Sequence, residues 1–286
     1  MTPGRTDEKG LRKMKENGRT AWVTGASSGL GMYTAQALRD AGWTVIAGAR
    51  SFSGASPEGD GTHRLALDVT DGDSVERFCR EAKSISARVD ALVQCAAILT
   101  LGSAEETSVE EYRRVMETNF FGMIRMNRQV LPMMRAQKAG KIVLFSSING
   151  LLGIPFQNAY TASKHAVEGY AEGLQMEVRP FGIQVCLIEP GDHRGGGQRT
   201  RLRAAAMGED SPYAAAFRSA AEKIRQDEAG GSDPAKLGRK VAKMLDRKTI
   251  PFRKRIAKPD QRLAVLLHDV LPPGLNERIL TGYYIH

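Results

Sequence analysis

The chain has 286 residues, of which 42% are hydrophobic and 26% charged, with 30 Gly, 12 Pro and 3 Cys. These proportions exclude a disordered, collagen-like or disulfide-scaffold protein and allow a sizeable core. The 41 Lys and Arg outnumber the 32 Asp and Glu, which gives a net charge of +9. A basic balance is compatible with nucleic acid, an anionic membrane surface or a phosphorylated ligand, and it does not choose among them.

The three cysteines, Cys79, Cys95 and Cys186, lie far apart and show no CxxC or CxxH spacing. This usage indicates a reduced, cytoplasmic protein without a structural zinc site, so no metal is expected. Residues 1–18 carry charges without an apolar core, and no later stretch reaches the roughly 18 apolar residues of a membrane-spanning helix. We interpret 1–18 as a flexible N-terminal arm and 19–286 as a single domain.

Short β-rich runs alternate with helical patterns from Arg19 onward. Strands are predicted at 20–25, 43–49, 63–69, 89–96, 141–147 and 183–190, and helices at 29–41, 71–87, about 108–138 and 158–180. This alternation predicts right-handed crossovers and a parallel sheet covered on both faces. The fold class is therefore α/β, with a doubly wound parallel sheet of the Rossmann type and C-terminal helices that cover the substrate. Ligands of such sheets bind outside the carboxyl ends of the strands.

The pattern changes after Pro190. Residues 191–201 predict a glycine-rich loop, and about 202–228 predict an Ala-rich amphipathic helix interrupted near Gly208 and Pro212. Residues 233–247 predict a capped helix, and the basic segment 251–258 predicts an edge strand. We expect residues 192–228 to form a lid over the substrate. The tail, 259–286, packs apolar residues at mixed spacing.

The segment TGASSGLG at 24–31 follows a predicted strand and opens a predicted helix. Glycines at this point let the backbone turn tightly and approach a pyrophosphate, which then lies at the helix N-terminus. The spacing of Gly25, Gly29 and Gly31 is Gly-x3-Gly-x-Gly, unlike GxGxxG. Glycines also make ordinary turns, but the strand before and the helix after favour a nucleotide site.

The second predicted strand ends in Ala49-Arg50-Ser51. A site selective for NAD usually has a carboxylate here, whereas a guanidinium suits the 2′-phosphate of NADP. Arg50 therefore favours NADP. The alternative is an exposed arginine at the end of a strand.

Ser147, Tyr160 and Lys164 form the most informative group. Tyr160 and Lys164 are four residues apart on one predicted helix, and Ser147 ends the strand that leads into it. A phenol with a pKa of about 10 is a poor acid at neutral pH, and a nearby ammonium stabilises the phenolate and lowers that pKa. We expect Tyr160 to act as general acid, with Ser147 holding the reacting carbonyl oxygen.

Together these residues resemble the short-chain dehydrogenase/reductase family from about Thr20 to Gly191. TGASSGLG is similar to its cofactor loop, LDV at 67–69 to its adenine-contacting segment, and TNFFG at 118–122 to the helix that carries Asn119. Ser147 followed by YTASK at 160–164 is similar to its catalytic signature, and IEPG at 188–191 resembles the strand and turn that border the nicotinamide.

The resemblance implies an NADP(H)-dependent oxidoreductase that interconverts a carbonyl group and its alcohol by hydride transfer. The catalytic residues would be Ser147, Tyr160, Lys164 and Asn119, with Asn119 in a water-linked proton relay and Lys164 also bonded to the nicotinamide ribose. Without the family, Asn119 would be interpreted as a polar residue inside a helix that faces solvent or a backbone carbonyl. The expected cofactor-binding residues are Gly25, Ser27, Ser28, Gly29, Leu30, Gly31, Arg50, Ser51, Asp68, Val69, Cys95, Ala96, Ala97, Tyr160, Lys164, Pro190 and Gly191.

Two positions depart from the family. Cys95-Ala96-Ala97 replaces its usual Asn-Ala-Gly, and Gly195 stands where a Thr commonly follows Pro-Gly. We interpret Cys95 as a small core residue rather than a reactive thiol. The C-terminal third resembles the 17β-hydroxysteroid and retinol dehydrogenase branch, which implies a lipophilic ketone, aldehyde or secondary alcohol. The resemblance also implies a homodimer or homotetramer through the helices at about 108–138 and 158–180.

Other features have plainer interpretations. His193 is expected to be an exposed loop residue. Basic residues at 199–203 and 253–255 predict solvated faces or weak peripheral contact with an anionic membrane. A second hypothesis for the whole chain is a catalytically silent NADP-binding sensor or scaffold. Nucleic-acid binding rests on the net charge alone, and with no recognition helix or stacking platform evident we expect no nucleic-acid partner.

Overall fold

A parallel β-sheet runs through the centre of the computed structural model, which describes residues 18–53, 56–57, 61–195 and 201–285. Its parallel strands within this part of the chain are β1 (Thr20–Thr24), β2 (Thr44–Ala49), β4 (Thr62–Ala66), β5 (Ala91–Gln94), β7 (Gly140–Phe145), β8 (Ile183–Pro190) and β10 (Arg253–Ile256). Their order is β10-β8-β7-β5-β1-β2-β4, and the short β3 (Ser56–Pro57) pairs antiparallel with β4 at the edge. This is the predicted doubly wound, Rossmann-type sheet.

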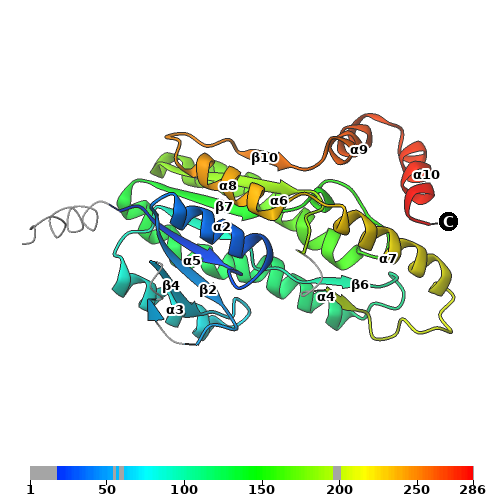
Figure 1. Cartoon of the computed structure of the whole chain (residues 1–286), viewed down its shortest axis with the longest axis horizontal. Helices are drawn as coiled ribbons and strands as arrows, with labels where there is room; N and C mark the ends of the chain where they lie inside the picture. The colour runs from blue at the N-terminus through cyan, green and yellow to red at the C-terminus, as the bar shows by residue number, and fades with distance from the viewer. Residues whose placement is uncertain (1–17, 54–55, 58–60, 196–200, 286) are drawn as a thin grey trace, which may run out of the picture.

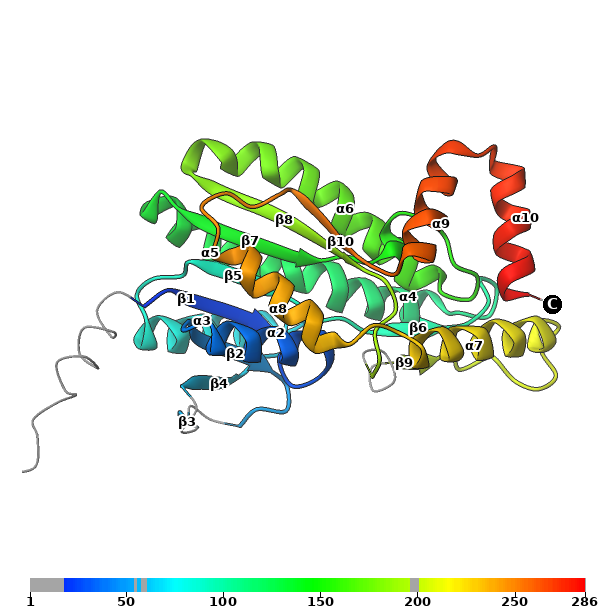
Figure 2. The same cartoon turned by 45° about the horizontal axis from the view of Figure 1, so that its top comes forward.

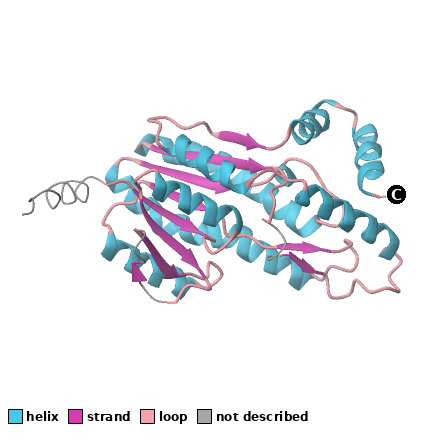
Figure 3. Cartoon of the chain, in the orientation of Figure 1, coloured by secondary structure: helices cyan, strands magenta, loops and turns pink. Residues whose placement is uncertain are grey.

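Helices cover both faces of the sheet (Figure 3). One face packs against α3 (Gly72–Ile85), α5 (Gly122–Gln137) and α6 (Asn158–Val178), and the other against α2 (Gly29–Asp40) and α8 (Pro234–Leu245). The strands alternate accordingly: Trp22 of β1 packs into the first layer against Phe78, and its neighbours Ala21 and Val23 pack into the second. Because both faces are buried, the strands are nearly continuous apolar runs.

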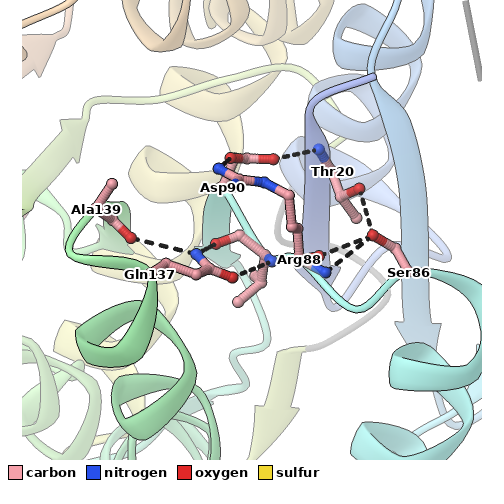
Figure 4. Close-up of polar contacts among 7 residues, drawn as sticks. Thr20, Ser86, Arg88, Asp90, Gln137 and Ala139 are labelled. Carbon is pink, nitrogen blue, oxygen red and sulfur yellow. Dashed lines mark hydrogen bonds and ion pairs between the residues drawn. The ribbon is translucent and has the colours of Figure 1, made fainter. Parts of the chain in front are cut away.

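A set of polar contacts fixes the amino ends of β1 and β5 (Figure 4). The Asp90 carboxylate accepts from the Thr20 backbone N–H at 2.9 Å and from Arg88 at 2.7 Å. The Gln137 side chain, at the end of α5, bonds both backbone groups of Val89. These bonds satisfy backbone groups that the sheet leaves free, at the edge opposite the strands' carboxyl ends.

The predicted helix at 108–138 is three consecutive pieces. α4 (Val109–Met116) begins with a capping box of Ser108 and Glu111, a π-helical turn follows at Glu117–Phe121, and α5 continues to Gln137. Single π-turns inside helices widen the helix by one residue and are frequent at functional sites. Asn119 lies in this turn.

The C-terminal third differs from the prediction. The helix expected from about 202 begins only at α7 (Ala214–Ala229), because residues 201–203 form β9, which pairs with β6 (Leu99–Leu101) outside the main sheet. The tail, in which the mixed spacing of apolar residues assigned no particular helix or strand, folds into α9 (Pro259–Val270) and α10 (Pro273–Tyr284), each with Pro at its first position. The predicted arm lies outside the described residues except for Gly18.

The strands point towards the side of the molecule where α7, α9 and α10 lie (Figures 1 and 2). α9 and α10 form a hairpin that projects from the rest of the fold in both views. Among the described helices, none combines the length and apolar character that crossing a bilayer requires. The loops after the strands therefore open towards these C-terminal elements, where a ligand is expected.

Candidate active site

A cavity of about 370 Å³ lies at the carboxyl ends of the central strands. Its walls include every cofactor-binding residue expected from the sequence: Gly25, Ser27, Ser28, Gly29, Leu30, Gly31, Arg50, Ser51, Asp68, Val69, Cys95, Ala96, Ala97, Tyr160, Lys164, Pro190 and Gly191. Ser147 lines it as well, so three of the four expected catalytic residues share the cavity with the glycine-rich loop. Asn119 does not line it.

The glycine-rich loop turns sharply between β1 and α2. Gly25 and Gly29 have φ values of 67° and 54°, in the left-handed region that favours glycine. A Cβ at Gly25 would lie 2.7 Å from the Ala96 backbone, and one at Gly31 would collide with the Gly25 carbonyl. Ser28, the N-cap of α2, makes no side-chain cap, so the first N–H groups of the helix remain available to an anion. These features fit a dinucleotide pyrophosphate.

Arg50 follows β2, and Asp68 follows β4. The motifs predict that this end of the cavity holds the adenine of the cofactor. Arg50 is exposed directly after the last residue of β2, Ala49. The Asp68 carboxylate accepts from the Thr70 backbone N–H at 2.9 Å and from its hydroxyl at 2.7 Å. Asp68 therefore shapes its own turn, while the guanidinium of Arg50 lines the cavity without a hydrogen bond or ion pair to another described residue.

Ser147 ends the segment after β7 and caps the short 3-10 helix Ile148–Gly150 by accepting from the Asn149 backbone N–H at 3.2 Å. The Asn149 amide donates to Gln157 at 2.9 Å. These contacts hold the Ser147 hydroxyl at the cavity wall. Tyr160, in the first turn of α6, lines the same cavity.

Tyr160 and Lys164 occupy successive turns of α6, and the Lys164 ammonium lies 5.5 Å from the centre of the Tyr160 ring. Lys164 is 2% exposed and donates to the Phe145 carbonyl at 2.7 Å. Burial lowers the pKa of Lys164 to about 8. The predicted lowering of the Tyr160 pKa is wrong for this structure: burial raises it to about 12, a hydrogen bond from Ser147 opposes that shift, and the charges of Glu228 and Asp192 reinforce it.

Asn119 lies behind the cavity wall, fully buried. Its side chain accepts from the Ile98 N–H at 2.8 Å and donates to the Ile98 carbonyl at 2.9 Å and to the Ser163 hydroxyl at 3.0 Å. It therefore joins the π-helical turn to the segment after β5 and to α6. Of the two alternatives for a polar residue inside a helix, Asn119 therefore faces a backbone carbonyl, that of Ile98, and not solvent.

Cys95 packs partly buried against the core layer of α2 and α8, and burial raises the pKa of its thiol. This agrees with its interpretation as a small core residue. His193 contradicts its prediction: it is 5% exposed, lines the cavity, and its Nδ1 lies 2.8 Å from the Gly191 carbonyl. The loop folds back against Ser232, which removes His193 from solvent.

One end of the cavity is lined by residues that were not among the expected site residues, although three of them belong to the predicted lid at 192–228. Ile154, Ile224 and Tyr284 line it, together with Gln157, Asp227 and Glu228. Ile224, Asp227 and Glu228 come from α7, and Tyr284 comes from the end of α10, about 120 residues after Tyr160 in the chain. Burial raises the pKa of Asp192, on the same wall, to about 6, with Asp227 and Glu228 adding to the shift. No local motif marks these positions.

The fold and the cavity define a dinucleotide-binding α/β protein whose cavity holds a Ser, a Tyr and a Lys beside the nucleotide loop. The model of the short chain dehydrogenase family matches residues 19–204. The chain belongs to the short-chain dehydrogenase/reductase family, whose members are oxidoreductases that interconvert carbonyl and alcohol groups.

Three relatives illustrate the match. A protein of Bacteroides thetaiotaomicron named 3-ketodihydrosphingosine reductase is 39% identical over 263 residues, which cover 92% of this chain and 96% of its own. A short-chain dehydrogenase of Streptomyces avermitilis has a similar structure, with a TM-score of 0.78 and 32% identity over 93% of this chain and 99% of its own. A Burkholderia phymatum family member, solved in complex with NAD, shares the fold at 23% identity, with a TM-score of 0.73 over 88% of this chain and 93% of its own.

Proposed function

We propose that this protein is an NADPH-dependent reductase of a lipophilic ketone, with Tyr160 as the general acid. The observation that carries the proposal is the meeting of Ser147, Tyr160 and Lys164 with the glycine-rich loop in one cavity. NADPH would supply the hydride. The chain's own side chains would orient the carbonyl group and supply the proton.

Ser147 would orient the substrate carbonyl by donating a hydrogen bond to its oxygen, and Tyr160 would transfer its proton to that oxygen as negative charge develops. The raised pKa of Tyr160, about 12, keeps the phenol protonated at neutral pH, which suits an acid in the reductive direction. Lys164 would place its positive charge beside the phenolate that forms. Asn119 would hold the wall behind them in place through Ile98 and Ser163.

The preference for NADPH is supported by Arg50. It occupies the position where an NAD site usually carries a carboxylate, lines the cavity and is exposed. A guanidinium matches the geometry of a phosphate and forms paired, charge-assisted hydrogen bonds with it. The relative solved with NAD has the same fold, so the fold itself does not decide this preference.

The lipophilic substrate is supported by four apolar or aromatic side chains of the cavity wall, those of Ile148, Ile154, Ile224 and Tyr284, although Gln157, Asp227 and Glu228 line it as well. The relative named for 3-ketodihydrosphingosine, a ketone with a long aliphatic chain, makes that compound the first substrate to test. α7 supplies part of this wall, which supports a covering role for the segment that includes it.

The test is the loss of reduced-nicotinamide absorbance with NADPH or NADH, for 3-ketodihydrosphingosine and a panel of lipophilic ketones and aldehydes. We expect turnover that favours NADPH. Tyr160→Phe should lower kcat by about a thousandfold, since general acids contribute roughly 10²–10⁴, while NADPH binding measured by fluorescence stays within about twofold. NADPH binding without turnover of any compound would favour a silent sensor, and unchanged turnover in Tyr160→Phe would exclude the proposed acid.

A further inference from the structure

Three carboxylates line the substrate end of the cavity. Asp227 and Glu228 lie one turn after Ile224 on α7, so the three side chains share the face of the helix that forms the wall. Asp192, two residues after β8, lines the same wall. Tyr160 packs against the apolar cluster that contains Ile224. Burial raises the pKa of Tyr160, and the charges of Glu228 and Asp192 add to the shift, so these carboxylates lie close to the proton donor.

Two of the carboxylates have cationic partners outside the cavity wall. Arg201 forms an ion pair with Glu228, and Lys223 forms one with Asp227 at 2.9 Å. Neither cation lines the cavity. Arg201 bonds one oxygen of Glu228, whereas the other, Oε2, is buried and receives no hydrogen bond from a described residue. Glu228 therefore keeps an acceptor that its ion pair does not use.

Asp192 has no ion-pair partner among the described residues. Its carboxylate accepts a hydrogen bond from the neutral amide of Gln261. Burial raises the pKa of Asp192 to about 6, the charges of Asp227 and Glu228 add to the shift, and Lys258, which does not line the cavity, opposes it together with Gln261. Asp192 is therefore mostly ionised at pH 7, and the three carboxylates have one ion-pair partner fewer than they have charges.

His193 supplies a further acceptor, next to Asp192 in the chain. It is 5% exposed and lines the cavity. Its Nδ1 lies 2.8 Å from the Gly191 carbonyl, which accepts only from a protonated nitrogen, so Nδ1 carries the hydrogen. Burial lowers the pKa of the ring, which is neutral at pH 7 and leaves Nε2 as an acceptor. Nε2 is buried without a donor among the described residues, so it requires one from outside the chain.

The wall formed by α7 and by the loop after β8 thus offers acceptors and negative charge. A phosphate or carboxylate on the substrate would be repelled there. Among the described residues, no group of three or more His, Cys, Asp or Glu side chains is placed to hold a metal ion. A protonated amine supplies up to three hydrogens and a positive charge, and its hydrogen bonds to carboxylates are charge-assisted. It therefore complements this wall.

We propose that the substrate ketone carries an ammonium group close to its carbonyl carbon, and that Asp192 selects it, with Glu228 and His193 as further acceptors. The inference rests on the proposed function, because it names the substrate class of the same cavity. Binding a cation would also explain Asp192 itself, since a buried carboxylate is costly unless it is paired. The apolar side chains of the wall would then hold the aliphatic part of the substrate.

The experiment compares two ketones at pH 7 with NADPH: 3-ketodihydrosphingosine, whose amino group is on the carbon next to the carbonyl, and its analogue with hydrogen in place of that amino group. The wild type should prefer the amino ketone about thirtyfold in kcat/KM, since one hydrogen bond to a charged group corresponds to a factor of roughly 10–100. Asp192→Asn should reduce this preference to about threefold or less. Equal kcat/KM values for the two ketones in the wild type would overturn the proposal.

Glu228→Gln and Glu222→Gln are a matched pair on α7. Both remove one negative charge and one partner of an arginine, but Glu222 is exposed and does not line the cavity. Glu228→Gln should lower the preference for the amino ketone severalfold, and Glu222→Gln should keep the wild-type ratio. If Glu222→Gln lowers the ratio as much as Asp192→Asn, or if Asp192→Asn slows both ketones equally, the proposed selection is wrong.

A second readout does not depend on turnover. Calorimetric titration of the NADP-loaded protein with octylamine and with octanol compares the same aliphatic chain with and without a positive charge. Octylamine should bind about tenfold more tightly to the wild type and to Glu222→Gln, and this difference should vanish in Asp192→Asn. Equal affinities in the wild type would refute the inference. If no ketone is turned over, the proposed function fails while this titration still decides whether the wall selects an amine.

Discussion

Arg50 is the residue on which the proposed preference for NADPH depends. It follows β2 at the cavity wall, and its guanidinium forms no ion pair with another described residue that a phosphate would have to displace. Lys164 is buried and Tyr160 is partly buried, so the protonation of both depends more on the surrounding protein than that of Arg50 does. Binding at the adenine end and chemistry at the nicotinamide end are therefore governed by different physical effects.

Arg50→Ala should raise KM for NADPH about thirtyfold and leave KM for NADH within about twofold. A charge-assisted hydrogen bond contributes about 1.5–3 kcal/mol, and each 1.4 kcal/mol corresponds to a factor of ten. Initial rates with both cofactors measure the difference. An equal rise for both would indicate that Arg50 supports the shape of the site and not phosphate recognition.

At the level of single elements, the close contact of α2 with α8 fixes the position of α2, which begins within the glycine-rich loop. Gly238 of α8 sits against the backbone of Tyr33 in α2, where a Cβ would collide with the Tyr33 carbonyl. Because α2 begins at Gly29, this contact also sets the direction in which its first N–H groups point.

Gly238→Ala should destabilise the protein by about 2 kcal/mol, since added atoms in a close-packed contact cost about 1–3 kcal/mol. Gly282→Ala, in α10, is the control: among the described residues no atom outside its own stretch of helix backbone lies within 4 Å of the added Cβ, and the change should stabilise by about 0.5–1 kcal/mol through helix propensity. Urea unfolding of both variants measures these values. A neutral Gly238→Ala would mean that the two helices can separate without loss.

Individual helices and strands also differ in whether the sequence predicts them. The strands, the glycine-rich loop and the positions of Ser147, Tyr160 and Lys164 were predictable because the ends of parallel strands converge on one edge. α9 and α10 were not, because apolar residues such as Leu263 and Leu266 are more than half exposed there and leave no buried stripe of helical period. β9 forms only because β6 offers it a partner, which no local pattern records.

Over the whole molecule, the cavity gathers residues from Gly25 of the first loop to Tyr284 of the last described helix. Nothing in the local sequence around Ile224 or Tyr284 marks a site, because their place in the wall is decided by how α7 and α10 pack against the sheet domain. α10 itself has no fully buried residue, and the Tyr284 carbonyl accepts from Ser219 of α7 at 3.1 Å.

Removal of residues 273–286 should therefore leave the sheet intact and open the substrate end of the cavity. We expect a melting temperature within a few degrees of wild type, an unchanged KM for NADPH and a KM for the lipophilic ketone raised about tenfold, corresponding to the roughly 1.4 kcal/mol lost with one apolar wall. Tyr284→Ala should reproduce most of the change in KM. A loss of cooperative thermal unfolding on truncation would show instead that the hairpin is part of the folding core.

Because β10 is an edge strand, its side chains also affect whether the sheet can pair with another chain. An exposed sheet edge is a template for pairing with another chain, and charged side chains along it oppose such association. In β10 the arginines that balance Glu189 and Glu168 lie on this edge, in the run Arg253–Ile256. Replacing them with apolar residues would therefore favour self-association as well as disturb the buried carboxylates, and aggregation would be the first visible result.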